Sequence, residues 1–410
     1  MKNSLSAKGQ AGFTLVELVV VMAVFIIVIM IATDSFNKIL INCGILSQRA
    51  ESNIEGVAGL EMLRHDLTQA GFGLPCSFAH STPPTYNEAA AAPGSNYNDS
   101  PNGIPRALVA GNNLAASTGV LDGTDLLVVK GTSLARSTVS QQWTYVNYSS
   151  SGSTPPRTWA SNNMVNNQDR VIVLRRRFTD SGTENQLVYD ESAPTQFYTI
   201  FSDQGFGTGQ TAFAPAIEQE TNFLYGVTSA QNPRMPFNRT DFYVKRPAAG
   251  LPSGCADHTG FLYQATLNHS DGSFTETPIL ACVADMQVVF GWDMDDDGVI
   301  ESYSNADGTT VNGWAAADVQ NLINNANLSA DQAATFRSRL KMVKVYLLAQ
   351  DGTRDRNYRN SNPIVVGNRD NGETSLTREW TVAAINTNNW TNYRWKVYRI
   401  VLTPNNLTFK

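Results

Sequence analysis

The stretch that decides the fold is residues 13–36, FTLVELVVVMAVFIIVIMIATDSF. Its first part, from Phe13 to Thr33, is almost entirely apolar, and about 20 such residues in a helix cross the hydrocarbon core of a bilayer. Residues 1–12, MKNSLSAKGQAG, carry Lys2 and Lys8 and no acidic residue. Because basic residues stay on the cytoplasmic side, we expect a cytoplasmic N-terminus and an exported remainder.

A processing site is expected before this apolar stretch. An ordinary secretory signal is cut after its apolar region, at small residues. Here the apolar run leads through Thr33 and Asp34 into more helix, whereas the small residues Ala11 and Gly12 precede it. On hydropathy alone, a simple uncleaved signal anchor remains the alternative.

Glu17 favours a cleaved segment over a simple uncleaved signal anchor. A carboxylate inside a membrane helix costs on the order of several kcal/mol, so it marks a functional site that needs a partner. No Lys or Arg lies within one helical turn of it. Cleavage after Gly12 would create a cation, the α-amine of Phe13, four residues upstream. The helix dipole also favours an acid in the first turn.

The string GFTLVE at residues 12–17 resembles the G-F-T-L-x-E processing signal of type IV pilins and of type II secretion pseudopilins. The resemblance implies that a prepilin peptidase cuts after Gly12 and that Phe13 is N-methylated. It also implies that Glu17 neutralises the amine of a neighbouring subunit when the helices bundle into a filament.

The helical pattern continues beyond the membrane. Apolar residues recur at mostly three- and four-residue steps from Leu40 to Leu67, with charged residues between them, which is typical of a helix packed on a domain. Gly71, Gly73 and Pro75 end it. We therefore predict a cleaved leader at 1–12, a transmembrane and spine helix at 13–70, and an extracytoplasmic head at 71–410.

The head is predicted to be α+β, with a mostly antiparallel sheet packed on the long N-terminal helix and long loops. Residues 77 to about 120 indicate a surface loop, and 315–325 and 330–339 indicate helices, the second capped by Ser329. Strand-like runs are 126–130, 144–148, 171–175, 197–201, 223–227, 242–245, 261–267, 286–292, 342–349, 380–385 and 395–402.

Four segments narrow the resemblance to PilW-like minor pilins: EMLRHDLTQAGFGLPC (61–76), GTDLLVVKG (123–131), CVADMQVVFGWDMDDDG (282–298) and RWKVYRIVLTPNN (394–406). They occur in the order that the family has. Insertions at about 77–260 have no counterpart in that pattern. The resemblance implies a minor pilin that initiates or caps a type IV pilus.

The four cysteines form no CxxC pair. Cys255 and Cys282 flank the run 261–267, so we predict a disulfide that closes this hairpin, in preference to a zinc site with His258. Cys43 and Cys76 would lie roughly 45–50 Å apart in a continuous helix, beyond disulfide reach.

An acidic loop at 293–304 predicts a structural calcium site. Carboxylates at alternate positions around a Gly turn can converge on Ca²⁺, as in the first half of an EF-hand. The expected ligands are Asp293, Asp295, Asp297, the carbonyl of Val299, and Glu301, because the twelfth position is Ser304. The alternative is an acidic surface turn without a metal.

Other function classes find no support. The formal net charge is −6 and the basic residues form no stripe, which disfavours nucleic-acid binding. No nucleophile, phosphate-binding or metalloprotease motif occurs, and His258 beside Asp257 is not a triad. We therefore predict no enzyme.

The expected partners are the prepilin peptidase, other minor and major pilins, and the inner-membrane assembly platform. The chain is expected in the inner membrane before assembly and on the cell surface afterwards. Two alternatives stay open: a J-like pseudopilin of a type II secretion system, and a pilus-tip adhesin delivered by the pilin segment.

Overall fold

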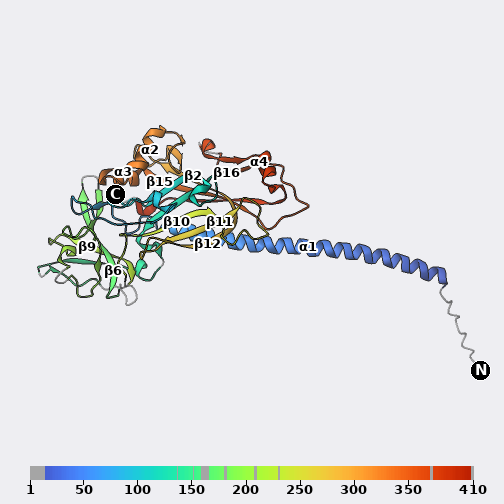
Figure 1. Cartoon of the computed structure of the whole chain (residues 1–410), viewed down its shortest axis with the longest axis horizontal. Coiled ribbons are helices and arrows are strands. Elements are labelled where there is room, and N and C mark those ends of the chain that lie inside the picture. Colours follow the sequence, from blue (N-terminus) through green and yellow to red (C-terminus); the bar gives the residue numbers. More distant parts are fainter. Residues whose placement is uncertain are drawn as a thin grey trace, which may run out of the picture.

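The computed structural model describes residues 14–135, 137–150, 152–157, 166–179, 182–206, 210–229, 231–369 and 373–407. Gly12 and Phe13 lie outside the described residues. Figure 1 shows one long helix that projects from a head built mainly of strands. The fold is α+β, with a helical spine and a β-rich head, as the sequence predicts.

Helix α1 spans Leu15–Thr68, 54 residues, or about 80 Å at 1.5 Å per residue. It starts at Thr14, whose side chain accepts the N–H of Glu17 at 3.3 Å. After the C-cap Gln69, Gly71 and Gly73 have φ angles of 82° and 63°, which favour glycine. The chain therefore turns away from the helix axis at the glycines that the sequence marks.

The main sheet has nine strands in the order β14-β13-β12-β11-β10-β3-β2, with β15 pairing β12 and β18. All its pairings are antiparallel. Strand β12 is 19 residues long; its first half pairs β11 and its second half pairs β13 and β15. The strands are β2 (Leu108–Leu114), β3 (Thr124–Gly131), β10 (Asn238–Lys245), β11 (Gly260–Leu267), β12 (Phe274–Trp292), β13 (Ser302–Asn305), β14 (Val311–Asn312), β15 (Leu340–Gln350) and β18 (Trp395–Leu402).

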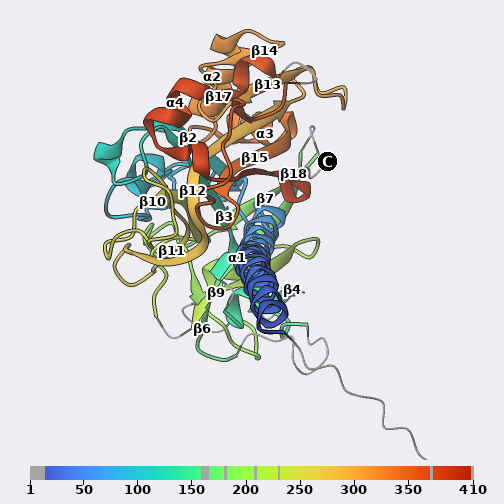
Figure 2. The ribbon, with the colours of Figure 1, turned by 90° about the vertical axis from the view of Figure 1, so that its right-hand side faces the viewer.

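The second half of α1 packs on this sheet. Figure 2 looks along α1 and shows β12 and β18 beside it. Leu63 and Leu67 are fully buried. A Cβ at Gly59 would lie 2.0 Å from the carbonyl oxygen of Ile279, and one at Gly56 would lie 2.7 Å from the hydroxyl of Tyr398. The two glycines therefore set how closely the helix approaches the sheet.

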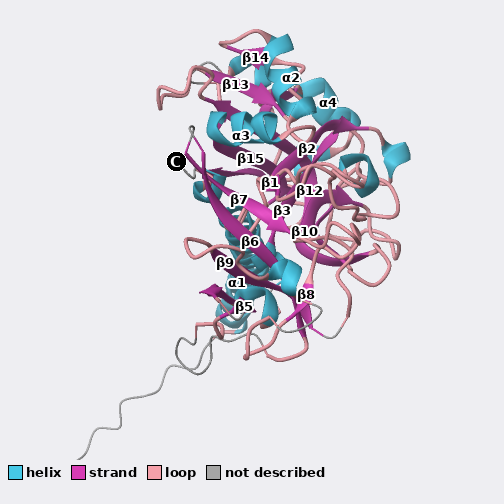
Figure 3. Ribbon diagram, turned by 90° about the vertical axis from the view of Figure 1, so that its left-hand side faces the viewer, coloured by secondary structure: helices cyan, strands magenta, loops and turns pink. Residues whose placement is uncertain are grey.

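A second sheet of seven strands follows the order β1-β7-β6-β9-β4-β5, with β8 on β6. It lies at the end of the head away from the projecting end of α1, and Figure 3 shows β6, β7 and β9 together. Val171, Val173 and Leu224 pack in a core of its own. Its strands are β1 (Ser77–Phe78), β4 (Trp143–Ser149), β5 (Gly152–Ser153), β6 (Asp169–Thr179), β7 (Gly182–Val188), β8 (Thr199–Ile200) and β9 (Thr221–Ser229). The predicted insertions thus form much of an additional lobe.

The shorter elements confirm some predictions and correct one. Helices α2 (Ala316–Asn325) and α3 (Ala330–Arg339) form where predicted, and Ser329 caps α3 by accepting the N–H of Gln332 at 3.3 Å. The predicted strand at 380–385 is wrong. Strand β17 (Arg378–Trp380), paired with β16 (Ile364–Val366), ends there, and Thr381 caps helix α4 (Val382–Thr387). The Thr381 cap outweighs the strand preference of the aromatic and β-branched residues.

The predicted surface loop at 77 to about 120 is also wrong. It contains β2, and its Tyr86, Glu88 and Asp99 are buried. The physical reason is a set of charges that pair inside the head, here called the buried charge cluster: Glu88, Asp99, Arg106, Lys130, Arg239 and Asp241. With its polar groups satisfied inside the protein, this segment can pack without an apolar composition.

Candidate functional site: an exposed apolar helix and an acidic loop

The first half of α1 is apolar and exposed on all sides. Its side chains from Leu15 to Ile31 stay about half or more exposed, Phe25 for example at 64%. Among the described residues, α1 is the one helix long and apolar enough to cross a membrane. Residues 14–44 are all exposed, whereas the guanidinium of Arg49 lies 3.9 Å from Asp355 of the head. Residues 14–44 of the chain are therefore free to contact lipid or other helices.

Glu17 lies exposed in the first turn of this free segment. It is the one charged residue of α1 before Asp34. No ion pair reaches Glu17 from the residues that the structure describes. Since Phe13 is outside those residues, the predicted pairing with an α-amine stays a prediction.

The acidic loop connects β12 to β13. Asp293, Asp295, Asp297 and Glu301 each offer one carboxylate oxygen, and these oxygens lie within 4.8 Å of one another. Buried Asp293 accepts the N–H groups of Asp297 at 3.1 Å and Gly298 at 2.9 Å. These bonds fold the loop back on its first acid, so that the four carboxylates face one point.

The surroundings of Asp293 favour its ionised form. Burial raises the pKa of Asp293, but the Gly298 N–H and the Lys341 ammonium, 3.3 Å away, outweigh it and hold the pKa below its usual range. One oxygen of Glu301 accepts the N–H of Met294 at 3.0 Å, while the other is buried without a hydrogen-bond partner. A buried acceptor without a donor is what a bound cation would satisfy, so the cluster can hold a metal ion.

Two details differ from a full EF-hand. The chain enters β13 at Ser302, and Ser304 is buried with its hydroxyl accepting the Trp292 indole N–H at 2.8 Å. The twelfth position is therefore part of a strand, and Glu301 supplies the last acid of the loop. Val299 donates its N–H to Asp297 at 2.8 Å; a ligand role for its carbonyl stays a prediction.

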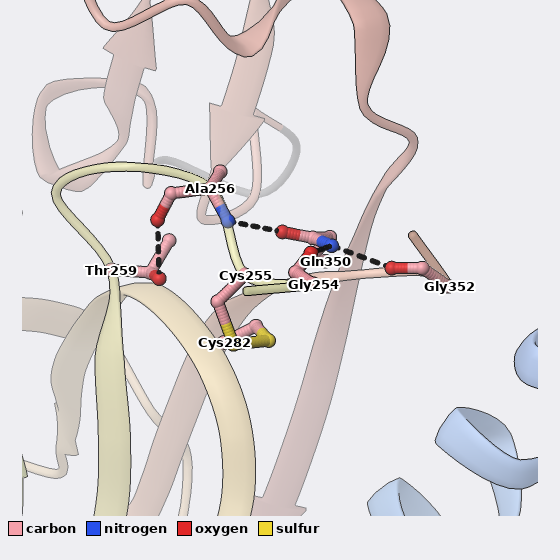
Figure 4. The surroundings of a disulfide bond; sticks show 7 residues. All are labelled: Gly254, Cys255, Ala256, Thr259, Cys282, Gln350 and Gly352. Atoms are coloured by element: carbon pink, nitrogen blue, oxygen red, sulfur yellow. Dashed lines mark hydrogen bonds between the residues drawn. A yellow bond between two sulfur atoms is a disulfide. The ribbon is translucent and has the colours of Figure 1, made fainter. Parts of the chain in front are cut away.

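Cys255 and Cys282 form a disulfide with their Cα atoms 5.1 Å apart. It joins the segment before β11 to an irregular point of β12, where Cys282 has a φ of 52°. In Figure 4 the side chain of Gln350 lies beside it: it accepts the N–H of Ala256 and donates to the carbonyls of Gly254 and Gly352. Cys43 and Cys76 are free thiols.

The histidines have no catalytic arrangement among the described residues. His269 lies in a turn but is buried; it accepts the N–H of Arg234 at 3.1 Å and contacts Asn238 at 2.9 Å. Burial lowers the pKa of His269 to about 4, so it is a neutral structural group. His258 lies in a turn with a φ of 62°.

Sequence reasoning missed the buried charge cluster. One signal was available: Lys130 ends the run DLLVVK, whose other members after the first Asp are apolar and whose neighbours in β3 are all buried. A Lys in such a strand needs a carboxylate partner, and here it has two, Glu88 at 2.7 Å and Asp99 at 2.6 Å.

Two family models match the chain. Residues 241–405 match the family described as Type IV Pilus-assembly protein W, and residues 7–33 match the Prokaryotic N-terminal methylation motif. No curated protein and no solved structure matches. The first match begins within β10 and covers the acidic loop and the strands from β11 to β18; neither match covers residues 34–240. The chain is thus PilW-like with a prepilin-type N-terminal signal, and the matches support a minor pilin of a type IV pilus.

Proposed function

We propose that this minor pilin initiates or caps filament assembly and sits at or near the pilus tip. The observation that carries the proposal is the free half of α1, apolar on all sides and bearing one acid, Glu17, in its first turn. A helix with this surface is stable in lipid or in a bundle of similar helices. Bundling with other pilins would cover it and give Glu17 its amine partner.

The tip location rests on the size and shape of the head. It comprises residues 71–410, and its second sheet extends it at the end away from the projecting helix. Such a subunit fits poorly into a densely repeated shaft. At the end of a filament the additional lobe would meet no subunit beyond it.

The assembly role is tested by Glu17→Ala, with Asp34→Ala as the matched control. Asp34 is an exposed acid of the same helix that pairs with Lys38 at 2.7 Å. We expect Glu17→Ala to insert into the membrane normally and to lose at least about tenfold in pilus incorporation, which corresponds to about 1.4 kcal/mol. Normal incorporation of Glu17→Ala would refute the charge-pair argument.

Processing and location follow from the same signal. A prepilin peptidase would cut after Gly12, methylation would follow at Phe13, and the head would face the periplasm before assembly with other pilins at the inner-membrane platform. Gly12→Val should block the cut, so that the protein keeps the mobility of the precursor on a gel. Deleting the protein distinguishes the two roles. Loss of surface pili would indicate the pilus role, and loss of protein secretion would indicate a J-like pseudopilin.

An added adhesive role is favoured by one observation: all seven strands of the second sheet lie in residues 34–240, which neither family match covers. Replacing residues 139–229 by a short linker should abolish attachment and leave pili intact. Loss of the pili themselves would count against an adhesin and assign the lobe to assembly.

For the acidic loop we propose a structural Ca²⁺ ion. The donors are carboxylate oxygens, the ligands that hard cations prefer, and the flexible geometry of Ca²⁺ suits a turn better than the strict octahedron of Mg²⁺. The ion would neutralise Asp293, Asp295, Asp297 and Glu301 and fix the connection between β12 and β13. No hydrolytic or redox step is assigned to it.

A further inference from the structure

A groove of about 590 Å³ lies where α1 leaves the head. One wall is the helix, at Glu51, Glu55, Ala58 and Met62. The other wall is β12 around Ile279 together with the disulfide segment that contains Cys255. We call this feature the helix groove. Residues from the segment 350–353 also line it, so the groove is formed by four separate segments of the sequence.

The groove has an apolar floor and an acidic rim. Its floor includes Met62, Ile279 and Leu280. Glu51 and Glu55 are exposed, and among the described residues neither forms an ion pair or a side-chain hydrogen bond. An occupant that complements this surface carries an apolar side chain next to a Lys or Arg.

The groove continues an exposed apolar row on α1. Leu46, Ala50, Ile54 and Ala58 follow at four-residue steps, which places them along one face of the helix. Ile54 is 73% exposed and Leu46 62%. Ala58 also lines the groove, so the row leads from the free half of the helix into it.

Lipid cannot be the occupant. The apolar run of α1 ends near Thr33, and Glu51 lies 18 residues further along the helix, about 27 Å at 1.5 Å per residue. With the run in the bilayer, the groove stands well above the acyl chains. The apolar residues of the groove are therefore available to a protein partner and not to lipid.

The walls are held in place before any partner binds. The disulfide ties the segment of Cys255 to β12, and Gln350 bonds to the backbone of Gly254, Ala256 and Gly352 around it (Figure 4). A preformed groove avoids the free-energy cost of ordering a loop on binding.

We propose that the helix groove receives the spine helix of a neighbouring pilin, at a point where an apolar residue lies one turn from a Lys or Arg. The inference rests on the proposed assembly function and extends it by naming the docking surface. An amphipathic helix lying in an apolar groove is a common mode of recognition. The acidic rim then selects the register of the two helices.

The test places a photo-crosslinking amino acid at Ala281, which lines the groove, in the full chain inside piliated cells. The control position is Ile217, which is 54% exposed and lies in the additional lobe formed around the second sheet. We expect a crosslink from position 281 to a peptide of the N-terminal helix of another pilin, and none from position 217. Crosslinks only to lipid, to this chain itself or to a partner's head, or no crosslink, would overturn the proposal.

A groove-filling variant separates this inference from the proposed function. Ala58→Trp should reduce the crosslink and the number of pili about tenfold while the melting temperature of the purified chain is unchanged; Ile217→Trp should change neither. If Ala58→Trp makes normal pili while Glu17→Ala does not, the groove proposal fails and the assembly role stands. If both make normal pili, the assembly role fails. If Ala58→Trp lowers the melting temperature, the crosslink from position 281 in the otherwise unchanged chain tests the proposal: a crosslink to the N-terminal helix of another pilin supports it, and its absence overturns it.

Discussion

The free half of α1 and the segment 77–107 reverse the usual relation between composition and burial. The helix exposes side chains such as Phe25 and Ile31, at 64% and 63%. The segment 77–107, rich in Ala, Ser, Asn and Pro, places Glu88 and Asp99 in the interior without any exposure of their side chains. Apolar residues lie outside and charged residues lie inside the same chain.

This contrast between the free half of α1 and the segment 77–107 shows that the burial of a side chain depends on whether it has an interaction partner, and not on its polarity alone. Glu88 and Asp99 meet Lys130, and Arg239 pairs with Asp241 at 2.7 Å and with Glu88 at 2.9 Å, so that each buried charge is compensated inside one molecule. The free half of α1 has no such partner in the described chain. Its partners must come from lipid and from other helices.

The largest effect is expected from removing a cation of the buried charge cluster. Lys130→Met keeps a long side chain in β3 but leaves Glu88 and Asp99 without their shared ammonium. Because breaking a buried pair strands an uncompensated charge, we expect a loss of about 3–5 kcal/mol in unfolding free energy. Urea titration of the full chain in detergent measures it.

Two controls sharpen this prediction. Arg369→Ala removes an exposed pair with Glu379 and should cost under about 1 kcal/mol. Ile54→Ala truncates an apolar side chain that is 73% exposed, and we expect a change within about 0.5 kcal/mol. A similarly small loss for Lys130→Met would contradict the view that pairing holds the segment 77–107 inside.

The acidic loop is intermediate between the free half of α1, which has no partner in the described part of the chain, and the buried charge cluster, whose charges are all paired, because the charges of the loop are only partly paired. Lys341 is one cation for several carboxylates, and one oxygen of Glu301 has no hydrogen-bond partner. A bound Ca²⁺ should therefore stabilise the head, by about 2.7 kcal/mol at a free concentration a hundred times its Kd. Melting curves with Ca²⁺ and with chelator measure the difference.

Glu301→Gln keeps the shape of the side chain but removes its charge, and it should abolish most of this stabilisation. Asp331→Asn, an exposed acid at the start of α3, is the control and should preserve it. Equal melting temperatures with Ca²⁺ and with chelator in the unchanged protein would leave the loop as an acidic turn.

The sequence predicts those parts whose determinants are contiguous. The GFTLVE string, the apolar run and the acidic loop each occupy one short segment. Strands such as β15 (LKMVKVYLLAQ) are recognisable as short runs rich in apolar and β-branched residues. Residues 380–385 predict a strand because Trp380 and Val382 favour strands, whereas the Thr381 cap of α4 acts through one hydrogen bond, which its hydroxyl accepts from the Ala384 N–H.

Features assembled from distant segments could not be predicted. Glu88, Lys130 and Arg239 meet only once the sheet has formed, so the segment 77–107 resembled an ordinary loop. The helix groove likewise needs α1, β12, the disulfide segment and residues 350–353 together. Contacts of long sequence separation leave no local pattern.

Asp125 is a buried acid that forms no ion pair among the described residues. Asp125 is 1% exposed and accepts the backbone N–H groups of Asn113 at 2.8 Å and Val288 at 2.7 Å. Burial, with a smaller contribution from Asp285, raises the pKa of Asp125 to about 8 despite these bonds. It contrasts with Asp99, whose pKa is lowered because Lys130 and Arg106 outweigh its burial.

The sign follows from proton binding. In the unfolded chain an Asp has a pKa near 4, so between about pH 4 and pH 8 the folded protein holds a proton that the unfolded chain has lost. The contribution of Asp125 to stability is therefore present below about pH 4 and is lost as the pH rises to about 8, by about 1.4 kcal/mol per unit. Asp125→Asn should flatten the slope of unfolding free energy between about pH 5 and pH 8, whereas Asp257→Asn, at an exposed position, should keep it. An undiminished slope in Asp125→Asn would mean that the backbone N–H groups alone keep this carboxylate charged, and that a buried acid here needs no cation.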